Sequence, residues 1–262
     1  SPEAQDKPYI EICKDINTLL HNAVQRRLVS DVPFGAFLSG GIDSSAIVAI
    51  MSQISNQKIN TFNISFHESE FSEAHHAAAI AKKFNTQHHQ IKLTPDHFLS
   101  QLPLALAAID HPSGDGPNSF IVSQATKNAG ITMALSGLGG DELFAGYDLF
   151  TRWISLNQKR TLAATPLWMR KIAGNILTKI KPSIASTKIN QLLHQPKINF
   201  NTFYPLQRQV LIDTQIQKLL NTTSHQPNQV QQIITNIPNT THQLSLVSIA
   251  EITTYMQNTL LR

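Results

Sequence analysis

The fold is decided by one stretch, Phe34-Gly35-Ala36-Phe37-Leu38-Ser39-Gly40-Gly41-Ile42-Asp43-Ser44-Ser45. Its first five residues form an apolar run that is typical of a buried strand. The adjacent glycines allow a tight turn and a close approach of the backbone to a ligand. Residues 44–54 continue at helical spacing, and the N–H groups at the start of a helix attract anions. The order of strand, glycine turn and helix therefore predicts a phosphate-binding turn.

Asp43 is the informative residue of this turn, because an unscreened carboxylate would repel a phosphate. A cation between the two groups removes the repulsion, and oxygen ligands of this kind suit magnesium. The turn lacks the Gly-Lys-Ser/Thr ending of a Walker A loop and the wider glycine spacing of a dinucleotide fingerprint. Asp43 and Ser44 can also be interpreted as ordinary helix caps.

A second glycine-rich turn follows the apolar run of residues 131–135 and reads Ser136-Gly137-Leu138-Gly139-Gly140-Asp141-Glu142-Leu143-Phe144-Ala145-Gly146-Tyr147. Asp141 and Glu142 stand at a predicted helix start, where the helix dipole alone would favour them. Two such turns at the carboxyl ends of a sheet would instead flank a magnesium triphosphate from both sides.

Strand and helix patterns alternate between residues 30 and 146. We expect strands at 34–38, 59–66, 88–93 and 131–135, and helices at 44–54, 73–84, 95–109 and 118–128. This alternation predicts an α/β fold with a doubly wound, mostly parallel sheet of about five strands and flanking helices. An amphipathic helix from Pro8 to Val29 precedes it, with Cys13 expected in the core.

After Tyr147 the strand signals disappear, and we expect a helical C-terminal region. The predicted domains are therefore a nucleotide-binding core at 1–150 and a helical region at 151–262. Residues 221–242 are rich in Asn, Gln, Thr and Pro, so we expect a surface excursion there.

Composition excludes several classes of function. The 262 residues are 41% apolar, which suffices for a core, and the formal net charge is +4. No basic run is interleaved with aromatic residues, so we expect no nucleic-acid partner. No apolar run reaches the roughly 20 residues of a membrane span, so we expect no membrane partner and a cytoplasmic protein. A single cysteine, Cys13, excludes an internal disulfide, and the pairs His75-His76 and His88-His89 lack the spacing of zinc ligands.

The first turn resembles the PP-loop of the ATP pyrophosphatase superfamily. The second resembles the asparagine synthetase family motif Ser-Gly-X-Gly-X-Asp-Glu with its aromatic-Gly-Gly-Tyr-type ending. The resemblance implies that ATP is split between its α and β phosphates and that Asp43 and Asp141 hold Mg²⁺. It also implies an ATP site made of Ala36, Phe37, Leu38, Ser39, Gly40, Gly41, Asp43, Ser44, Ser45, Ile64, Ser136 and Gly137.

The same resemblance implies an amide-forming ligase: the side-chain carboxylate of aspartate is adenylated, and ammonia displaces AMP. The ammonia would come from a glutaminase domain that we expect to be missing from this chain, and assembly as a homodimer is left open. Residues Asp110, Asp115, Asn118 and Glu142 are the candidates for the substrate side. Asp115 and Asn118 also fit a turn followed by a helix cap.

Leu138 departs from the many family members that carry an acid at that position, and it resembles a subgroup with Gly-Leu-Gly-Gly-Asp-Glu-Leu-Phe. The alternatives are therefore the same chemistry on another acid, such as a sugar acid, peptide or antibiotic precursor, or a nucleotide-binding module without turnover. A tRNA-modifying PP-loop enzyme is disfavoured, because the chain lacks a basic patch and a cysteine cluster.

Overall fold

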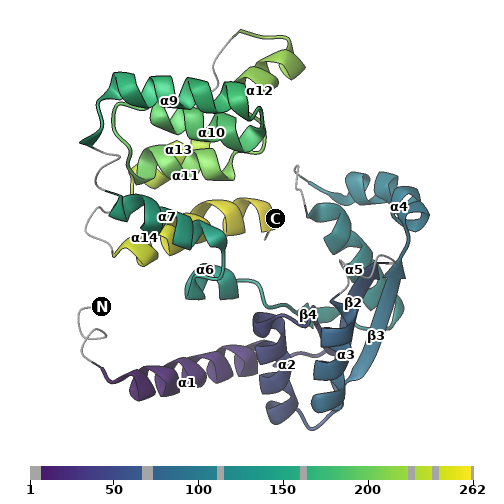
Figure 1. Ribbon diagram of the computed structural model, residues 1–262. Coiled ribbons are helices and arrows are strands. Elements are labelled where there is room, and N and C mark those ends of the chain that lie inside the picture. Colours follow the sequence, from purple (N-terminus) through teal and green to yellow (C-terminus); the bar gives the residue numbers. More distant parts are fainter. Residues whose placement is uncertain are drawn as a thin grey trace. The chain divides into compact units, whose positions relative to one another are not determined.

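The computed structural model describes residues 7–66, 73–110, 115–159, 164–223, 228–237 and 242–260. Contacts along the chain divide it into two compact units, unit 1 (Ser1–Leu138) and unit 2 (Gly139–Arg262). The division falls inside the second glycine-rich turn. Figure 1 labels the helices and strands of both units.

Unit 1 contains a parallel four-stranded sheet. The strand order is β3-β2-β1-β4, and every neighbouring pair is parallel. The strands are β1 (Phe34–Phe37), β2 (Asn60–Phe66), β3 (Gln87–Leu93) and β4 (Met133–Leu135). The predicted α/β class with a parallel sheet is confirmed, and the described residues form four strands where about five were expected.

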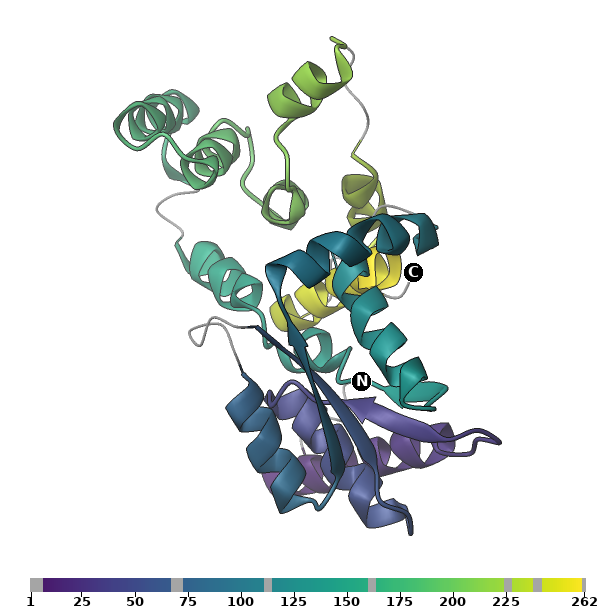
Figure 2. The same ribbon diagram turned by 90° about the vertical axis from the view of Figure 1, so that its right-hand side faces the viewer.

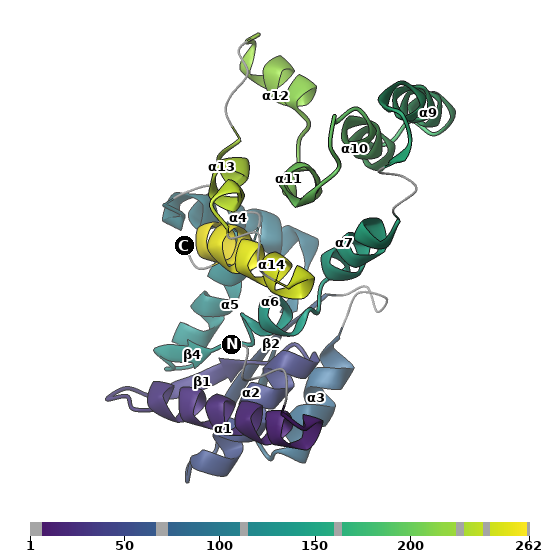
Figure 3. The same cartoon turned by 90° about the vertical axis from the view of Figure 1, so that its left-hand side faces the viewer.

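Helices cover both faces of this sheet (Figures 1 and 3). On one face lie α1 (Tyr9–Arg27), α2 (Ile42–Ile54) and α3 (Ala74–Lys83), and on the other α4 (Pro95–Ala108) and α5 (Gly116–Asn128). The chain moves outward from β1 to β3 through α2 and α3, then returns across the opposite face to β4, beside β1. Right-handed crossovers require this change of face when the direction of winding reverses.

The core of unit 1 lies between α1–α3 and the sheet. Its buried apolar side chains are Val24, Ala36, Leu38, Val48, Ile50, Met51, Ile59, Ala77 and Ala81. The prediction that Cys13 belongs to the core is wrong, because the thiol is exposed. The side of α1 that packs inward carries Leu20, Val24 and Leu28, at four-residue intervals that continue the row of Ile12 and Ile16. Cys13 is one residue, or about 100° of helix rotation, away from that row.

The described residues of unit 2 are helical, as the sequence predicts (Figure 2). The elements are α6 (Gly140–Phe144), α7 (Asp148–Gln158), α9 (Leu167–Ile180), α10 (Ile184–Leu193), α11 (Phe200–Arg208), α12 (Asp213–Leu220), α13 (Gln229–Thr235), α14 (Gln243–Ala250) and the π-helix η3 (Glu251–Leu260). Aromatic rings dominate its core, where Trp153 lies 5.2 Å from Phe200 and 5.3 Å from Phe203 between ring centroids.

The prediction of a surface excursion at 221–242 is wrong in part. Residues 224–227 and 238–241 lie outside the described residues, but α13 lies between them. Its Ile234, together with Ile237 just beyond the helix, is buried in the aromatic core of unit 2. Two isoleucines within a polar segment are enough to bury one side of a short helix, and the average composition conceals this.

Candidate functional site

The first glycine-rich turn joins β1 to α2 and depends on Gly40. This residue has φ +92°, and a Cβ atom added to it would lie 2.7 Å from the backbone nitrogen of Ala77 in α3. Both the backbone conformation and the space therefore require glycine. Gly41 is the N-cap of α2 and gives it no side-chain cap. The start of α2 consequently presents backbone rather than a capping side chain, as an anion site at a helix start does.

Two serine hydroxyls hold this turn in shape. The Ser44 hydroxyl donates to the Gly41 carbonyl (3.2 Å) and accepts from the Ser39 backbone N–H (3.3 Å). The Ser39 hydroxyl accepts from the Gly41 N–H (3.2 Å) and lies 3.0 Å from the Ser44 hydroxyl. The buried Ser45 hydroxyl forms no hydrogen bond with any described residue. Among the three serines, Ser45 therefore has the hydroxyl with unused hydrogen-bonding capacity.

The second turn leaves the sheet beside the first. Strands β1 and β4 are parallel neighbours in the register Gly35 to Ala134, so Ser39 and Ser136 follow their strands at the same edge. A Cβ added to Gly137 would lie 2.7 Å from the Ser44 nitrogen and 2.9 Å from the Asp43 carbonyl carbon. The backbones of the two turns are in close contact here. The chain reverses its winding between β1 and β4, and such switch points bind ligands in α/β sheets.

Of the residues expected on the adenine side, Ala36 and Leu38 have their side chains in the core of unit 1. Contacts of these two residues with a nucleotide would therefore use the backbone. The Leu38 carbonyl accepts a hydrogen bond from Asn63 Nδ2 (3.0 Å), while Asn63 Oδ1 is buried and has no partner among the described residues. The side chains of Phe37 and Ile64 are half-buried.

Asp141 stands in the first turn of α6, in unit 2, on a backbone of unusual conformation. Gly139 before it has φ +96°, and Ala145 after it has φ +62°. Any side chain at Gly146 would collide with the Asp141 carboxylate. The Gly146 N–H also donates to the Asp141 carbonyl (3.0 Å). The Ala145-Gly146 pair thus folds the chain back against Asp141 and fixes where this carboxylate lies within unit 2.

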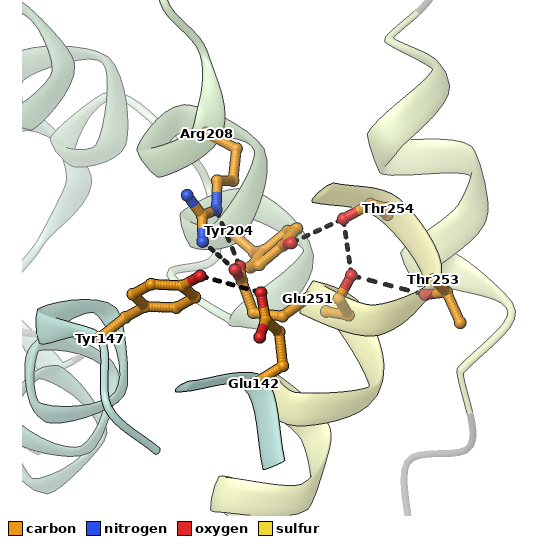
Figure 4. A network of polar contacts seen from close by, with 8 residues as sticks. Glu142, Tyr147, Tyr204, Arg208, Glu251, Thr253 and Thr254 are labelled. Atoms are coloured by element: carbon orange, nitrogen blue, oxygen red, sulfur yellow. Dashed lines mark hydrogen bonds and ion pairs between the residues drawn. The ribbon is translucent and has the colours of Figure 1, made fainter. Parts of the chain in front are cut away.

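Glu142 is fully buried next to Asp141 (Figure 4). The Tyr147 hydroxyl donates to Glu142 Oε1 at 2.9 Å, while Oε2 is buried without a partner among the described residues. Burial of the phenol, together with this bond to a carboxylate, raises the pKa of Tyr147 above its ordinary range. The tyrosine therefore stays protonated and acts as a hydrogen-bond donor at neutral pH.

The same region of unit 2 contains a partly buried ion pair (Figure 4). The Arg208 guanidinium binds both carboxylate oxygens of Glu251, with Nε 2.8 Å from Oε1. It also lies 3.9 Å from the ring centroid of Tyr255 and 5.3 Å from that of Tyr147. Beside it, the Tyr204 hydroxyl is 2.7 Å from Thr254 Oγ1. Together with Glu142, these side chains form what we call the polar cluster of unit 2: Glu142, Tyr147, Tyr204, Arg208, Glu251, Thr254 and Tyr255.

Sequence reasoning missed Tyr204, Arg208, Glu251 and Tyr255. One signal was available: Asp213 and Glu251 are the only acidic residues after Asp148. An isolated acidic residue in a long helical region with almost no other acids is a candidate for a specific ion pair. Glu251 is also the first residue of the π-helix η3. This conformation is rare and is frequently found at functional sites.

The remaining substrate candidates lie in unit 1. Asp110 follows α4 and is exposed. Asp115 precedes α5, and its carboxylate accepts from the Ser119 hydroxyl (3.1 Å) and from Asn118 Nδ2 (3.4 Å). These bonds are those expected from a turn followed by a helix start. Residues 111–114 of this loop lie outside the described residues. A substrate role for Asp110, Asp115 and Asn118 stays a prediction.

Comparison with known proteins identifies the family. A family model described as asparagine synthase matches residues 15–262. The chain belongs to the asparagine synthase family. Its relatives include asparagine synthetase [glutamine-hydrolyzing] 1 of Bacillus subtilis, 34% identical over 149 residues, which cover 56% of this chain and 23% of the relative. A putative asparagine synthetase [glutamine-hydrolyzing] 2 of Methanocaldococcus jannaschii is 39% identical over 132 residues, covering 49% of this chain and 25% of the relative.

These matches to asparagine synthetases span about a quarter of each relative's length. Among solved structures, the NH3-dependent NAD synthetase from Campylobacter jejuni has a TM-score of 0.37 and 12% identity, over 76% of this chain and 98% of that one. A similarity of this degree carries no argument about this chain. Membership of the asparagine synthase family therefore rests on the sequence.

Proposed function

We propose that this chain is the ATP-binding, amide-forming part of an asparagine synthetase-type ligase. A substrate carboxylate attacks the α-phosphorus of ATP, the bond to the β-phosphate breaks and pyrophosphate leaves. Ammonia then attacks the acyl carbon and releases AMP. The preferred acid is the side chain of aspartate, and the ammonia is derived from glutamine elsewhere in the protein. The observation that carries the proposal is the close contact of the two glycine-rich turns at the switch point between β1 and β4.

The pyrophosphate end of ATP is assigned to the first turn and the start of α2. Gly40 and Gly41 give the backbone its shape there, and α2 begins without a capping side chain. Backbone N–H groups and the helix dipole stabilise negative charge as it builds up on the leaving group. Ser45 contributes the hydroxyl that no described residue uses. Ser136 and Gly137 are assigned to the ribose and the α-phosphate.

Magnesium is assigned to Asp43 and Asp141. No group of three or more His, Cys, Asp or Glu side chains in the described part of the chain is arranged to hold a metal by itself. Mg²⁺ that arrives with a nucleotide needs only one or two protein carboxylates besides the phosphates, so the donor set fits the ion. When bound, Mg²⁺ supplies positive charge beside the phosphate oxygens. Asp43 and Asp141 would hold the ion, and its charge would offset the repulsion between these carboxylates and the phosphates.

The first test is a calorimetric titration of this chain with magnesium ATP, with EDTA as the metal control. Asp43→Asn should weaken binding by about tenfold or more, because it removes the charge that holds the metal. The matched control is Asp96→Asn, which removes an exposed aspartate from the first turn of α4. Equal affinities of the Asp43→Asn variant and the parent chain would exclude Asp43 from the metal site.

The second candidate is the same chemistry on a different acid. Leu138, which is 49% exposed, stands where many family members have an acid, so a role of that acid in handling the incoming amine does not carry over to this chain. Pyrophosphate exchange into ATP, measured with aspartate and with a panel of sugar acids and peptides, distinguishes the two. Exchange that depends on aspartate supports the first candidate. ATP binding without exchange for any acid would indicate a nucleotide-binding module without turnover.

A further inference from the structure

Helix α9 of unit 2 exposes its apolar side. Its large exposed apolar residues are Trp168 (64%), Met169, Ile172, Ile176 and Ile180 (78%). Trp168, Ile172, Ile176 and Ile180 recur every fourth residue, so they form one stripe along the helix, about 21 Å long for its 14 residues. We call this set of five side chains the α9 stripe. Figures 2 and 3 show α9 at the end of a row formed with α10 and α11.

The opposite side of α9 makes the contact with α10. Gly174 is buried there, and a Cβ added to it would collide with the side chain of Asn190. Arg170 is also buried on this side and donates to the Pro196 carbonyl (3.1 Å). An amphipathic helix normally turns its apolar side to the core. In α9 the buried residues are a glycine and an arginine, and the apolar side stays exposed among the described residues.

The charge around the stripe has one sign. Residues 149–212 contain ten Lys and Arg residues and no Asp or Glu, although the formal net charge of the whole chain is only +4. Lys171, Lys179 and Lys181 are exposed on or directly after α9. Within the described ranges, no carboxylate forms an ion pair with any of these three lysines. The stripe is therefore flanked by positive charge that its own unit leaves uncompensated.

We propose that α9 binds in the plane of an anionic phospholipid surface. A helix with Trp and large aliphatic residues on one side and lysines beside them suits the boundary between headgroups and acyl chains. The tryptophan prefers this boundary, and the lysines reach anionic headgroups with their ammonium groups while their stems cover apolar surface. None of the described helices is long and apolar enough to cross a membrane. The sequence expectation of no membrane partner rested on spanning segments alone, and in-plane binding needs none.

The fluorescence emission of Trp168 can report whether the α9 stripe binds to vesicles. The chain has two tryptophans, and Trp153 is only 4% exposed. In a Trp153→Phe variant of the full chain, Trp168 is the single tryptophan, and excitation at the red edge of its absorption avoids the tyrosines. Its emission should shift to shorter wavelength when phosphatidylcholine vesicles containing phosphatidylglycerol are added. Vesicles of phosphatidylcholine alone should give no shift, and added salt should reverse the effect, because the attraction between the charges is screened.

Two double variants, compared in a vesicle sedimentation assay, separate the contribution of the lysine charges to vesicle binding from that of the apolar side chains. Lys179→Gln with Lys181→Gln should lower the partition coefficient by about fivefold per lysine. Ile172→Ser with Ile176→Ser should lower it by about tenfold or more, because two aliphatic side chains no longer leave water. The matched control, Leu219→Ser, removes an exposed leucine from α12 and should leave the partition unchanged. Circular dichroism checks that each variant keeps its helices.

Two results would overturn the proposal. One is unchanged Trp168 emission with every vesicle composition. The other is self-association of the chain, measured by analytical ultracentrifugation, that the isoleucine variant abolishes in the absence of lipid while vesicle binding stays undetectable. The stripe would then be an interface between copies of this chain.

Discussion

The backbone of one residue, Ala145, is strained. Its φ of +62° and ψ of +41° place it in the left-handed region, directly before Gly146 and after α6. An L-residue with a Cβ atom pays roughly 1–2 kcal/mol for this conformation, whereas glycine does not. The strain persists because the turn must fold back against Asp141, where Gly146 leaves room for the carboxylate.

We therefore expect Ala145→Gly to stabilise unit 2 by about 1 kcal/mol. Urea unfolding, followed by the fluorescence of the buried Trp153, measures the change. The matched control is Ala173→Gly, at an exposed position within α9, where the same substitution should cost about 1 kcal/mol. Loss of stability in both variants would show that Ala145 is not strained.

Gly137 is the residue at which the two glycine-rich turns touch. We expect Gly137→Ala to weaken magnesium ATP binding by about tenfold or more, because the added methyl group would push the second turn away from Ser44. The control is Gly130→Ala. Unlike Gly137, Gly130 has a positive φ, +80°, and its Cβ would meet no atom within 4 Å. If both variants bind the nucleotide equally well, the close contact at Gly137 does not shape the site.

At the scale of elements, the polar cluster of unit 2 depends on the pair formed by Arg208 of α11 and Glu251 of η3. The Glu251 side chain is completely buried, whereas that of Arg208 is 23% exposed. We expect Glu251→Gln to destabilise unit 2 by about 2 kcal/mol, because a partly buried guanidinium loses its counter-charge. Asp148→Asn, which removes an exposed pair with Arg152, should change stability by less than about 1 kcal/mol. Urea unfolding of both variants checks the difference, and similar values would contradict it.

The sequence predicts the elements well where their pattern is strong. Apolar runs of four or five residues, each followed by a glycine turn, locate β1 and β4, and helical spacing locates α2 and α5. It fails where burial depends on partners distant in the chain. Cys13 lies one residue from the buried row of α1, and α13 is polar on average although Ile234 reaches the core.

Side-chain roles within the site are less predictable than its elements. Ser39 and Ser44 suggest phosphate ligands in the sequence, but their hydroxyls hydrogen-bond within the turn itself. The π-helix differs from an α-helix by one residue in its hydrogen-bond spacing, a difference that no apolar pattern reveals. Arg208, the ion-pair partner of Glu251, is 43 residues away on α11, so only the folded chain brings the two together.

In the molecule as a whole, the two aspartates that are proposed to hold magnesium belong to different compact units. Asp43 is part of unit 1 and Asp141 is part of unit 2. Each unit also has its own apolar core, one between helices and a sheet and the other built on aromatic rings. Each unit buries apolar surface that is largely its own, so we expect each unit to unfold cooperatively and separately from the other.

Glu251→Gln therefore tests cooperativity as well as the ion pair. We expect the variant to speed amide hydrogen exchange throughout the protected helices of unit 2, by the factor that corresponds to its loss of stability. Exchange in β1 and β2 of unit 1 should keep the rates of the parent chain. Mass spectrometry of peptides from each unit measures both at once, with Asp148→Asn as the control that should change neither. A matching acceleration in unit 1 would mean that the chain opens as one cooperative body, and a loss of nucleotide affinity in any unit 2 variant would then follow from global unfolding rather than from the site.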